Sequence, residues 1–156
     1  MGAEIERKFL VDTARWQPEG PGELYVQGYL SSAKERTVRV RREGDRAVIT
    51  VKGPNQGVTR AEFEYAIPAA DADAMLKMCE QPLIQKRRHK EKHDAHTWEI
   101  DVFAGENAGL VVAEIELASE TEAFEKPAWV GREVSDDPRY YNASLIKAPY
   151  STWRES

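Results

Sequence analysis

Hydrophobic and polar residues alternate with a period of two in eight short segments of the chain, which is the pattern of half-buried β-strands. Helical periodicity is confined to residues 68–79, 120–125 and 142–147. Turn sequences such as Glu43-Gly44-Asp45-Arg46 separate neighbouring segments, as expected for antiparallel hairpins. We therefore predict a mainly β (α+β) fold with strands at 3–11, 23–32, 36–43, 46–52, 58–67, 83–93, 96–103 and 110–119.

Charged residues occupy one face of nearly every predicted strand. Because residues two apart in a strand point to the same side, Glu4, Glu6 and Lys8 share one face, while Ile5 and Phe9 share the other. The charges are also sorted by strand. The acidic pairs are Glu4 with Glu6, Glu99 with Asp101 and Glu114 with Glu116, and the basic pairs are Arg39 with Arg41 and Lys86 with Arg88.

The ordinary explanation of such alternation is a sheet with one face on the core and one in water. A surface tuned only for solubility would mix the two signs, however, and paired arginines suit phosphate oxygens held from several directions. If the sheet closes into a barrel, its charged face becomes a wet lumen. Carboxylates in that lumen could hold hard divalent cations, and the basic side chains could hold a polyanion.

The composition is that of one globular domain, residues 1–156, with 31% charged and 41% hydrophobic residues. No apolar stretch approaches the roughly 20 residues needed to cross a bilayer. The net charge of -5 argues against broad adhesion to nucleic acid or to an anionic membrane, so an anionic ligand requires a local site. The first residues lack the pattern of a secretory signal, and Cys79 has no partner for an intrachain disulfide, so we expect a cytoplasmic protein.

Four other residues could carry chemistry. His89, His93 and His96 surround one predicted hairpin and raise the question of zinc. No cysteine is near them in the sequence, and hard cations prefer the carboxylates, so we interpret this region as a surface turn. Cys79 lies in a helical stretch with Met75, which predicts packing in the core.

The segment Glu4-Ile5-Glu6-Arg7-Lys8 resembles the ExExK signature of the CYTH superfamily, also called triphosphate tunnel metalloenzymes. The resemblance covers nearly the whole chain and is to the short, single-domain bacterial branch. One departure is Arg87-Arg88-His89, where relatives commonly show Thr, Arg and Tyr. The further blocks that carry the resemblance are, in order, residues 27–30, 38–41, 50–52, 60–64, 86–88, 98–103, 113–116 and 136–142.

The resemblance implies an eight-stranded antiparallel β-barrel, the triphosphate tunnel, flanked by a few helices, which binds a small-molecule triphosphate with Mg²⁺ or Mn²⁺. By position, it implies metal-binding carboxylates at Glu4, Glu6, Glu114 and Glu116, with Glu62, Glu64, Glu99 and Asp101 as outer or second-metal candidates. It also implies phosphate ligands at Lys8, Arg39, Arg41, Lys52, Lys86 and Arg88, with Arg60 as an additional candidate.

The implied activity is hydrolysis of a terminal phosphoanhydride, with Glu4, Glu6 and Lys8 at the catalytic centre. Whether Lys8 acts as a general base is open, because arginines and a metal would lower its pKa while carboxylates would raise it; phosphate contact is its first expected role.

Inorganic tripolyphosphate is the preferred substrate, since a short chain without an appended module offers few elements for reading a base or a thiazolium ring. Nucleoside triphosphatase, thiamine triphosphatase and adenylate cyclase activities are alternatives within the family. A non-catalytic polyphosphate-binding module is another, but it would not need the acidic pairs.

Overall fold

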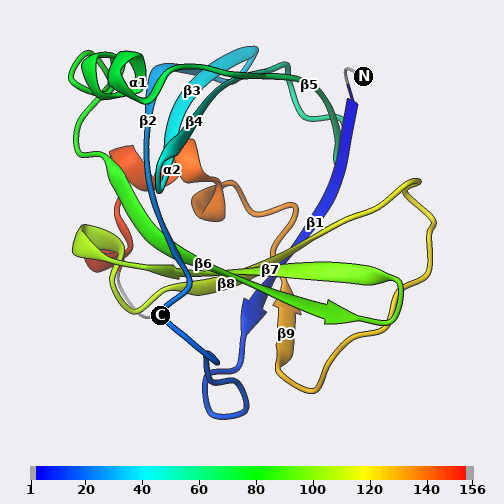
Figure 1. Ribbon diagram of the computed structural model, residues 1–156. Helices are drawn as coiled ribbons and strands as arrows, with labels where there is room; N and C mark the ends of the chain where they lie inside the picture. The colour runs from blue at the N-terminus through cyan, green and yellow to red at the C-terminus, as the bar shows by residue number, and fades with distance from the viewer. Residues whose placement is uncertain (1–2, 154–156) are drawn as a thin grey trace.

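The computed structural model describes residues 3–153, which form a closed ring of antiparallel strands (Figure 1). The single domain predicted over 1–156 thus includes five terminal residues outside the described part. The strands are β1 (Ala3–Val11), β2 (Glu23–Ala33), β3 (Arg36–Glu43), β4 (Arg46–Lys52), β5 (Thr59–Ala66), β6 (Ile84–His93), β7 (His96–Phe103), β8 (Val111–Glu116) and β9 (Val130–Glu133).

The first strand closes the ring because it has a different partner at each end. Its beginning pairs with β5, where Ala3 lies opposite Ala61, and its remainder pairs with β8, where Glu6 lies opposite Glu116. The order around the ring is β1-β8-β7-β6-β2-β3-β4-β5, and β9 adds to β1 from outside this circuit. The predicted eight-stranded antiparallel fold is confirmed.

Two of the three predicted helices are present: α1 (Ala69–Leu76) and α2 (Asn142–Lys147). The helix predicted at 120–125 is wrong, because this segment is a turn followed by chain without regular secondary structure. Its side chains bind the barrel wall instead: Glu122 pairs with His96 at 2.6 Å, and the ring of Phe124 packs on Trp98. Tertiary contacts here outweigh a short helical pattern.

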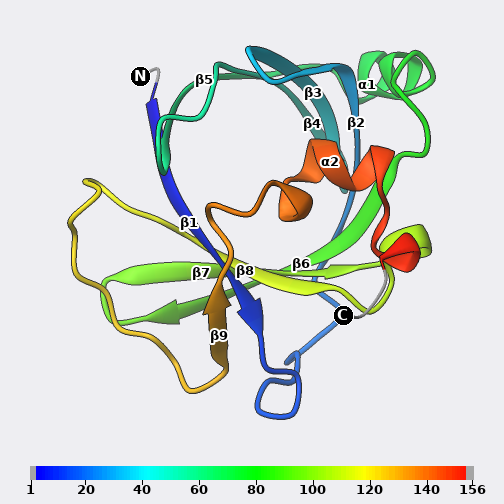
Figure 2. The same ribbon diagram turned by 180° about the vertical axis from the view of Figure 1, so that it is seen from behind.

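The sequence pattern gave no sign of β9 or of three short 3₁₀ helices, η1 (Gly105–Asn107), η2 (Pro138–Tyr140) and η3 (Tyr150–Thr152). In η2, the Asp137 side chain accepts a hydrogen bond from the Arg139 amide, and Pro138 supplies a fixed φ at the first position. Figure 2 shows η2 and α2 crossing the opening of the ring. The C-terminal segment therefore covers one mouth of the lumen.

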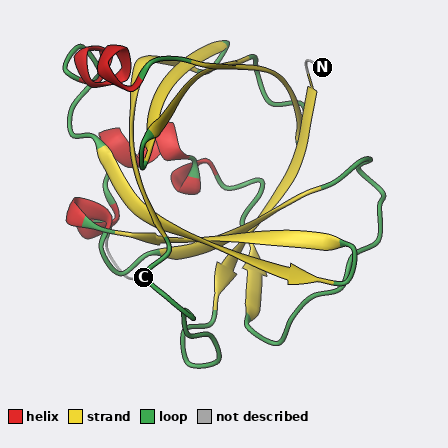
Figure 3. Ribbon diagram, viewed as in Figure 1, coloured by secondary structure: helices red, strands yellow, loops and turns green. Residues whose placement is uncertain are grey.

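The apolar core is divided into three clusters around the charged lumen. One cluster lies on the outer faces of β1, β7 and β8 and includes Phe9, Trp98 and Trp129. A second lies under α1, which packs on β3 and β4 as Figure 3 shows, and it contains Cys79, as predicted. The third joins Tyr29 to η2, α2 and the barrel end of β6–β8. No helix among residues 3–153 is long and apolar enough to cross a membrane.

Replacing Trp98 by Ala tests whether the outer cluster stabilises the ring. This side chain is fully buried, and its ring makes edge-to-face contacts with Phe9, Phe124 and Trp129 at centroid distances of 5.6, 5.9 and 5.6 Å. Removing a buried aromatic side chain costs about 3–5 kcal/mol. Urea denaturation should show a loss of that order in the free energy of unfolding.

Tyr65→Ala is the matched control, because Tyr65 is 62% exposed. We expect it to change the free energy of unfolding by no more than about 0.5 kcal/mol. A similar small change for Trp98→Ala would contradict the role given to the outer cluster.

Candidate active site

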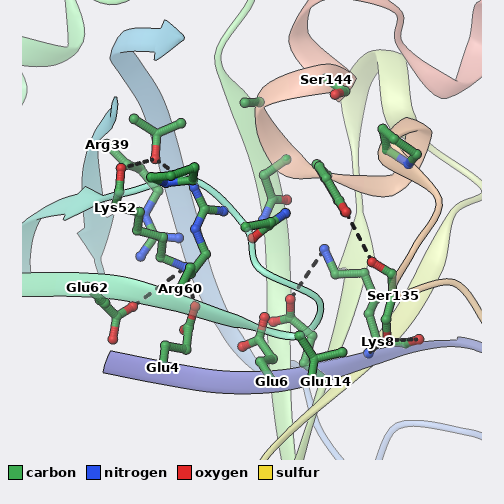
Figure 4. A pocket seen from close by; sticks show the side chains of 18 of the residues that line it. Glu4, Glu6, Lys8, Arg39, Lys52, Arg60, Glu62, Glu114, Ser135 and Ser144 are labelled. Carbon is green, nitrogen blue, oxygen red and sulfur yellow. Dashed lines mark hydrogen bonds and ion pairs between the residues drawn. The ribbon is translucent and has the colours of Figure 1, made fainter. Parts of the chain in front are cut away.

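The inner faces of the strands enclose a cavity of about 560 Å³ whose lining is mostly charged. Alternation along each strand explains this lining, because every second residue points inward while its neighbours enter the outer core. Figure 4 shows Arg39, Lys52 and Arg60 in one part of the cavity, with Glu4 beside Lys52 and Glu6 beside Glu114. The predicted residues that line it are Glu4, Glu6, Lys8, Arg39, Arg41, Lys52, Arg60, Glu62, Glu64, Arg88, Glu99, Glu114 and Glu116.

Lys86 and Asp101 do not line the cavity, although they share strand faces with residues that do. Their relative exposures are 0% and 1%, and Lys86 Nζ lies 2.7 Å from an Asp101 carboxylate oxygen. Burial lowers the pKa of Lys86 to about 8, while for Asp101 the attraction of Lys86 and Arg88 outweighs burial and lowers the pKa. The sequence predicts that both residues contact or surround the ligand. This stays a prediction, and the burial of both side chains argues against it.

The carboxylates gather where β1, β8 and β5 meet. Residue Glu6 lies opposite Glu116 in the β1–β8 ladder, and Lys8 lies opposite Glu114. From the adjoining side, Lys52 Nζ approaches a Glu4 oxygen at 2.9 Å and a Glu62 oxygen at 3.5 Å. One stretch of wall thus carries more acidic than basic groups.

The pKa values show which carboxylates lack compensation. Burial raises the pKa of Glu6 well above its usual range, with Glu114 and Glu4 adding to the shift. Burial, reinforced by the charge of Glu4, also raises the pKa of Glu62 to about 7 and that of Glu116 in the same direction. Burial, together with repulsion among neighbouring carboxylates, therefore disfavours the charged form of these three groups.

Two carboxylates of the same group are compensated by lysines. Burial acts to raise the pKa of Glu4, but Lys52 outweighs it and the pKa is lowered. Likewise, Lys8, Arg88 and other bases overcome the burial of Glu114 and hold its pKa well below the usual value. Among residues 3–153, no three His, Cys, Asp or Glu side chains are gathered in an arrangement that could hold a metal.

The donor chemistry nevertheless fits a hard divalent cation. The carboxylates whose pKa is raised carry the oxygen ligands that Mg²⁺ and Mn²⁺ prefer. A cation among Glu6, Glu62 and Glu116 would offset the repulsion that raises their pKa values. The residue types present thus suit such an ion, although no three of these side chains within residues 3–153 are gathered closely enough to hold one.

The basic wall is held in place by hydrogen bonds. Arg88 donates to both oxygens of Asp101 at 2.7 and 2.8 Å and to Glu114 at 3.0 Å. Arg41 Nε donates to Glu43 at 2.6 Å, and Arg60 donates twice to a backbone carbonyl oxygen at 3.0 and 2.8 Å. Arginines fixed in this way can contact an anion with little loss of side-chain freedom.

Lys8 lies at the junction of the acidic wall and the C-terminal segment. Its Nζ donates to the Tyr140 carbonyl oxygen at 3.1 Å and lies 3.4 Å from a Glu114 oxygen. Its backbone amide donates to Ser135 Oγ at 2.9 Å. Both neighbours of the amino group accept hydrogen bonds. This arrangement suits an ammonium group that contacts phosphate, and it suits a general base less well.

Sequence reasoning missed the contribution of the C-terminal segment to the cavity. Ser135, Tyr141, Asn142 and Ser144 all line it. The Asn142 Oδ1 atom is buried and has no hydrogen-bond partner among residues 3–153. The block 136–142 carries part of the family resemblance, but its place in the sequence, far from the predicted strands, does not show that it returns to the lumen.

The three histidines diverge from one another. The ring of His89 packs on Trp16, that of His93 on Trp129, and that of His96 on Phe124. The hairpin at 93–96 is confirmed. The predicted surface turn lies at the exposed Asp94 and Ala95, and the histidines that flank it are partly buried.

Comparison with known proteins identifies this arrangement. The CYTH domain family matches residues 2–147. The chain belongs to that family. Its CYTH relatives include a protein of Acetivibrio thermocellus named inorganic triphosphatase, 48% identical over 99% of this chain and 100% of the relative, and one of the same name from Nitrosomonas europaea, 37% identical over 91% and 95%.

The fold of these CYTH proteins is also known. The crystal structure of an inorganic triphosphatase, 34% identical, covers 91% of this chain and 96% of that chain with a TM-score of 0.64. The ring of strands and the tunnel expected from the sequence resemblance are therefore those of the family.

Glu62→Gln tests the electrostatics of the acidic wall in metal-free protein. The Glu62 pKa is about 7 in the folded chain against 4.5 ordinarily, so the folded state retains a proton that the unfolded chain releases between these values. The group thus lowers stability progressively as pH rises from about 4.5 to about 7, and by a constant amount above. Relative to wild type, the variant should gain stability across this window.

Urea denaturation at several pH values in the presence of a chelator measures the difference. The control is Glu106→Gln, since Glu106 is exposed on η1 and does not line the cavity. It removes a carboxylate away from the cavity and so shows the effect of the substitution itself. A pH-independent difference for Glu62→Gln would show that this carboxyl is not protonated in the folded chain.

Proposed function

We propose that the protein is a divalent-metal-dependent triphosphatase that hydrolyses inorganic tripolyphosphate. The observation that carries this proposal is that one enclosed cavity holds a group of carboxylates, of which Glu6, Glu62 and Glu116 have raised pKa values, beside a set of basic residues fixed by hydrogen bonds. An anion-binding module would need only the second. The names of the relatives that are 48% and 37% identical support the same activity.

Glu4, Glu6, Glu114 and Glu116 would hold the metal, with Glu62 and Glu64 beside them. Mg²⁺ or Mn²⁺, when bound, supplies neutralisation of phosphate oxygens and acidifies a bound water. The basic residues Arg39, Arg41, Lys52 and Arg88 bind the phosphate chain and orient its terminal group for in-line attack. In phosphoryl transfer, positioning and charge stabilisation account for most of the catalysis.

A linear triphosphate suits the cavity because its basic residues come from four strands. Arg39 and Arg41 lie on β3, Lys52 on β4, Arg60 on β5 and Arg88 on β6. A nucleoside or thiamine triphosphate, or cyclisation of ATP, would place an organic group at the open mouth. The cytoplasmic location expected from the sequence remains a prediction.

The substrate series tests the proposed activity directly. Tripolyphosphate should be hydrolysed with a kcat/KM at least roughly tenfold above that of pyrophosphate, because contacts to a remote phosphate help to orient the reacting one. It should also exceed the value for ATP. Phosphate release with Mg²⁺ and with Mn²⁺ is the measurement.

A preference for pyrophosphate would contradict a clamp that spans three phosphates. Cyclic AMP formed from ATP would assign the chain to the cyclase alternative. Binding of tripolyphosphate without any turnover would assign it to the non-catalytic module.

Removal of one metal-ligand charge tests the acidic wall. Glu4→Gln and Glu116→Gln keep the shape of the side chain, so we expect a folded protein that has lost at least about 100-fold in kcat. The exposed Glu106→Gln is again the control and should retain wild-type turnover. Circular dichroism confirms folding, and a Mg²⁺ titration of activity measures the effect. Near-wild-type turnover in either cavity variant would remove that residue from the metal site.

A further inference from the structure

Tyr25 lies in the wall of the lumen, between two of its arginines. On β2 it pairs with Glu43 of β3 and with Lys86 of β6, and it is 2% exposed. Its ring centroid is 4.8 Å from Cζ of Arg41 and 5.1 Å from Cζ of Arg88. One aromatic ring therefore contacts guanidinium groups from two different strands.

The two arginines repel each other, although each is also paired with carboxylates, Arg41 with Glu43 and Arg88 with Asp101 and Glu114. Burial lowers the pKa of Arg41, and the charges of Arg39 and Arg88 lower it further. The face of an aromatic ring attracts guanidinium groups, and the ring itself has little conformational freedom. Tyr25 can thus hold both groups at a fixed separation in the absence of an anion.

The other side of this contact is acidic. Tyr25 and Arg88 also line a second cavity, of about 320 Å³, together with Glu19, Glu23 and Glu91. Three carboxylates on one rim attract a neighbouring cation. Arg88 lines both cavities, so its contact with the ring of Tyr25 lies where the two cavities adjoin.

We propose that Tyr25 is a positioning residue, which sets the spacing and direction of Arg41 and Arg88 for a chain of phosphates. The role belongs to its aromatic face and not to its hydroxyl group. It rests on the proposed function in one respect, namely that the ligand of the main cavity is a polyphosphate.

Titration calorimetry of metal-free protein with tripolyphosphate and with pyrophosphate tests this role without hydrolysis. Tyr25→Phe keeps the ring and should bind tripolyphosphate within about twofold of wild type. Tyr25→Leu should bind it roughly tenfold more weakly, which corresponds to about 1.4 kcal/mol. The loss for pyrophosphate should be smaller, because a shorter anion does not need both arginines at once. Tyr65→Leu, on the exposed outer face, is the matched control and should not change either affinity.

A double-mutant cycle separates positioning from a structural effect. If Tyr25 acts through the arginines, then Tyr25→Leu should cost less in the background of Arg41→Ala than in wild type. Additive effects would overturn the proposal, as would a loss in Tyr25→Phe equal to that in Tyr25→Leu. Should the Leu variant not fold, Tyr25→Met, which fills a similar volume without an aromatic face, takes its place.

The outcome is independent of turnover. A wild-type protein that binds tripolyphosphate but does not hydrolyse it with Mg²⁺ or Mn²⁺ would contradict the proposed function and leave the binding test intact. Wild-type affinity for tripolyphosphate in both the Leu and the Met variants would contradict the role of Tyr25, whatever the activity.

Discussion

The enclosure of charge is the physical constraint on which the rest of this structure depends. A closed ring removes the inward side chains from much of the solvent, and a buried charge is costly unless a partner or a ligand offsets it. Most inward bases meet this condition within the wall, as Arg88 does with Asp101 and Arg41 with Glu43. The carboxylates on β1 and β8 meet it only in part, and this imbalance is what distinguishes a site from a merely polar interior.

The same constraint explains where the apolar core lies. With the lumen given to charge, the hydrophobic side chains must pack outside the ring or at its end, under α1, under the loop after β8 and against α2. The small helices are therefore more than connections. Without the side chains that they contribute, the outer faces of the strands would be open to water, and a sheet of this length would have little to hold it together.

Period-two alternation was sufficient to predict most of the strands and the inward set of residues, because face is a local property of a strand. How deeply a side chain is buried within the wall of the lumen is not a local property. Lys86 and Arg88 share a face of β6, yet one is sealed in the wall and the other borders the cavity. The helix predicted at 120–125 is wrong, and the return of Ser135–Ser144 to the lumen was not predicted, for a related reason. Contacts with distant strands determine the structure of both segments, and the pattern of nearby residues carries no record of those contacts.

The pairing of β1 has a consequence for how the chain folds. Residues 6–10 pair with residues 112–116, and residues 9–11 pair with β9 near residue 130, so the ring joins segments that are more than a hundred positions apart. Such long loops close slowly, and the last partners of β1 are also the last to be synthesised. In a nascent chain, the first strand therefore stays unpaired along one edge until β8 and β9 have been synthesised. The charged face of that strand keeps it hydrated during the delay, so the residues that suit a polyanion site also protect the unfinished protein from association through an open edge.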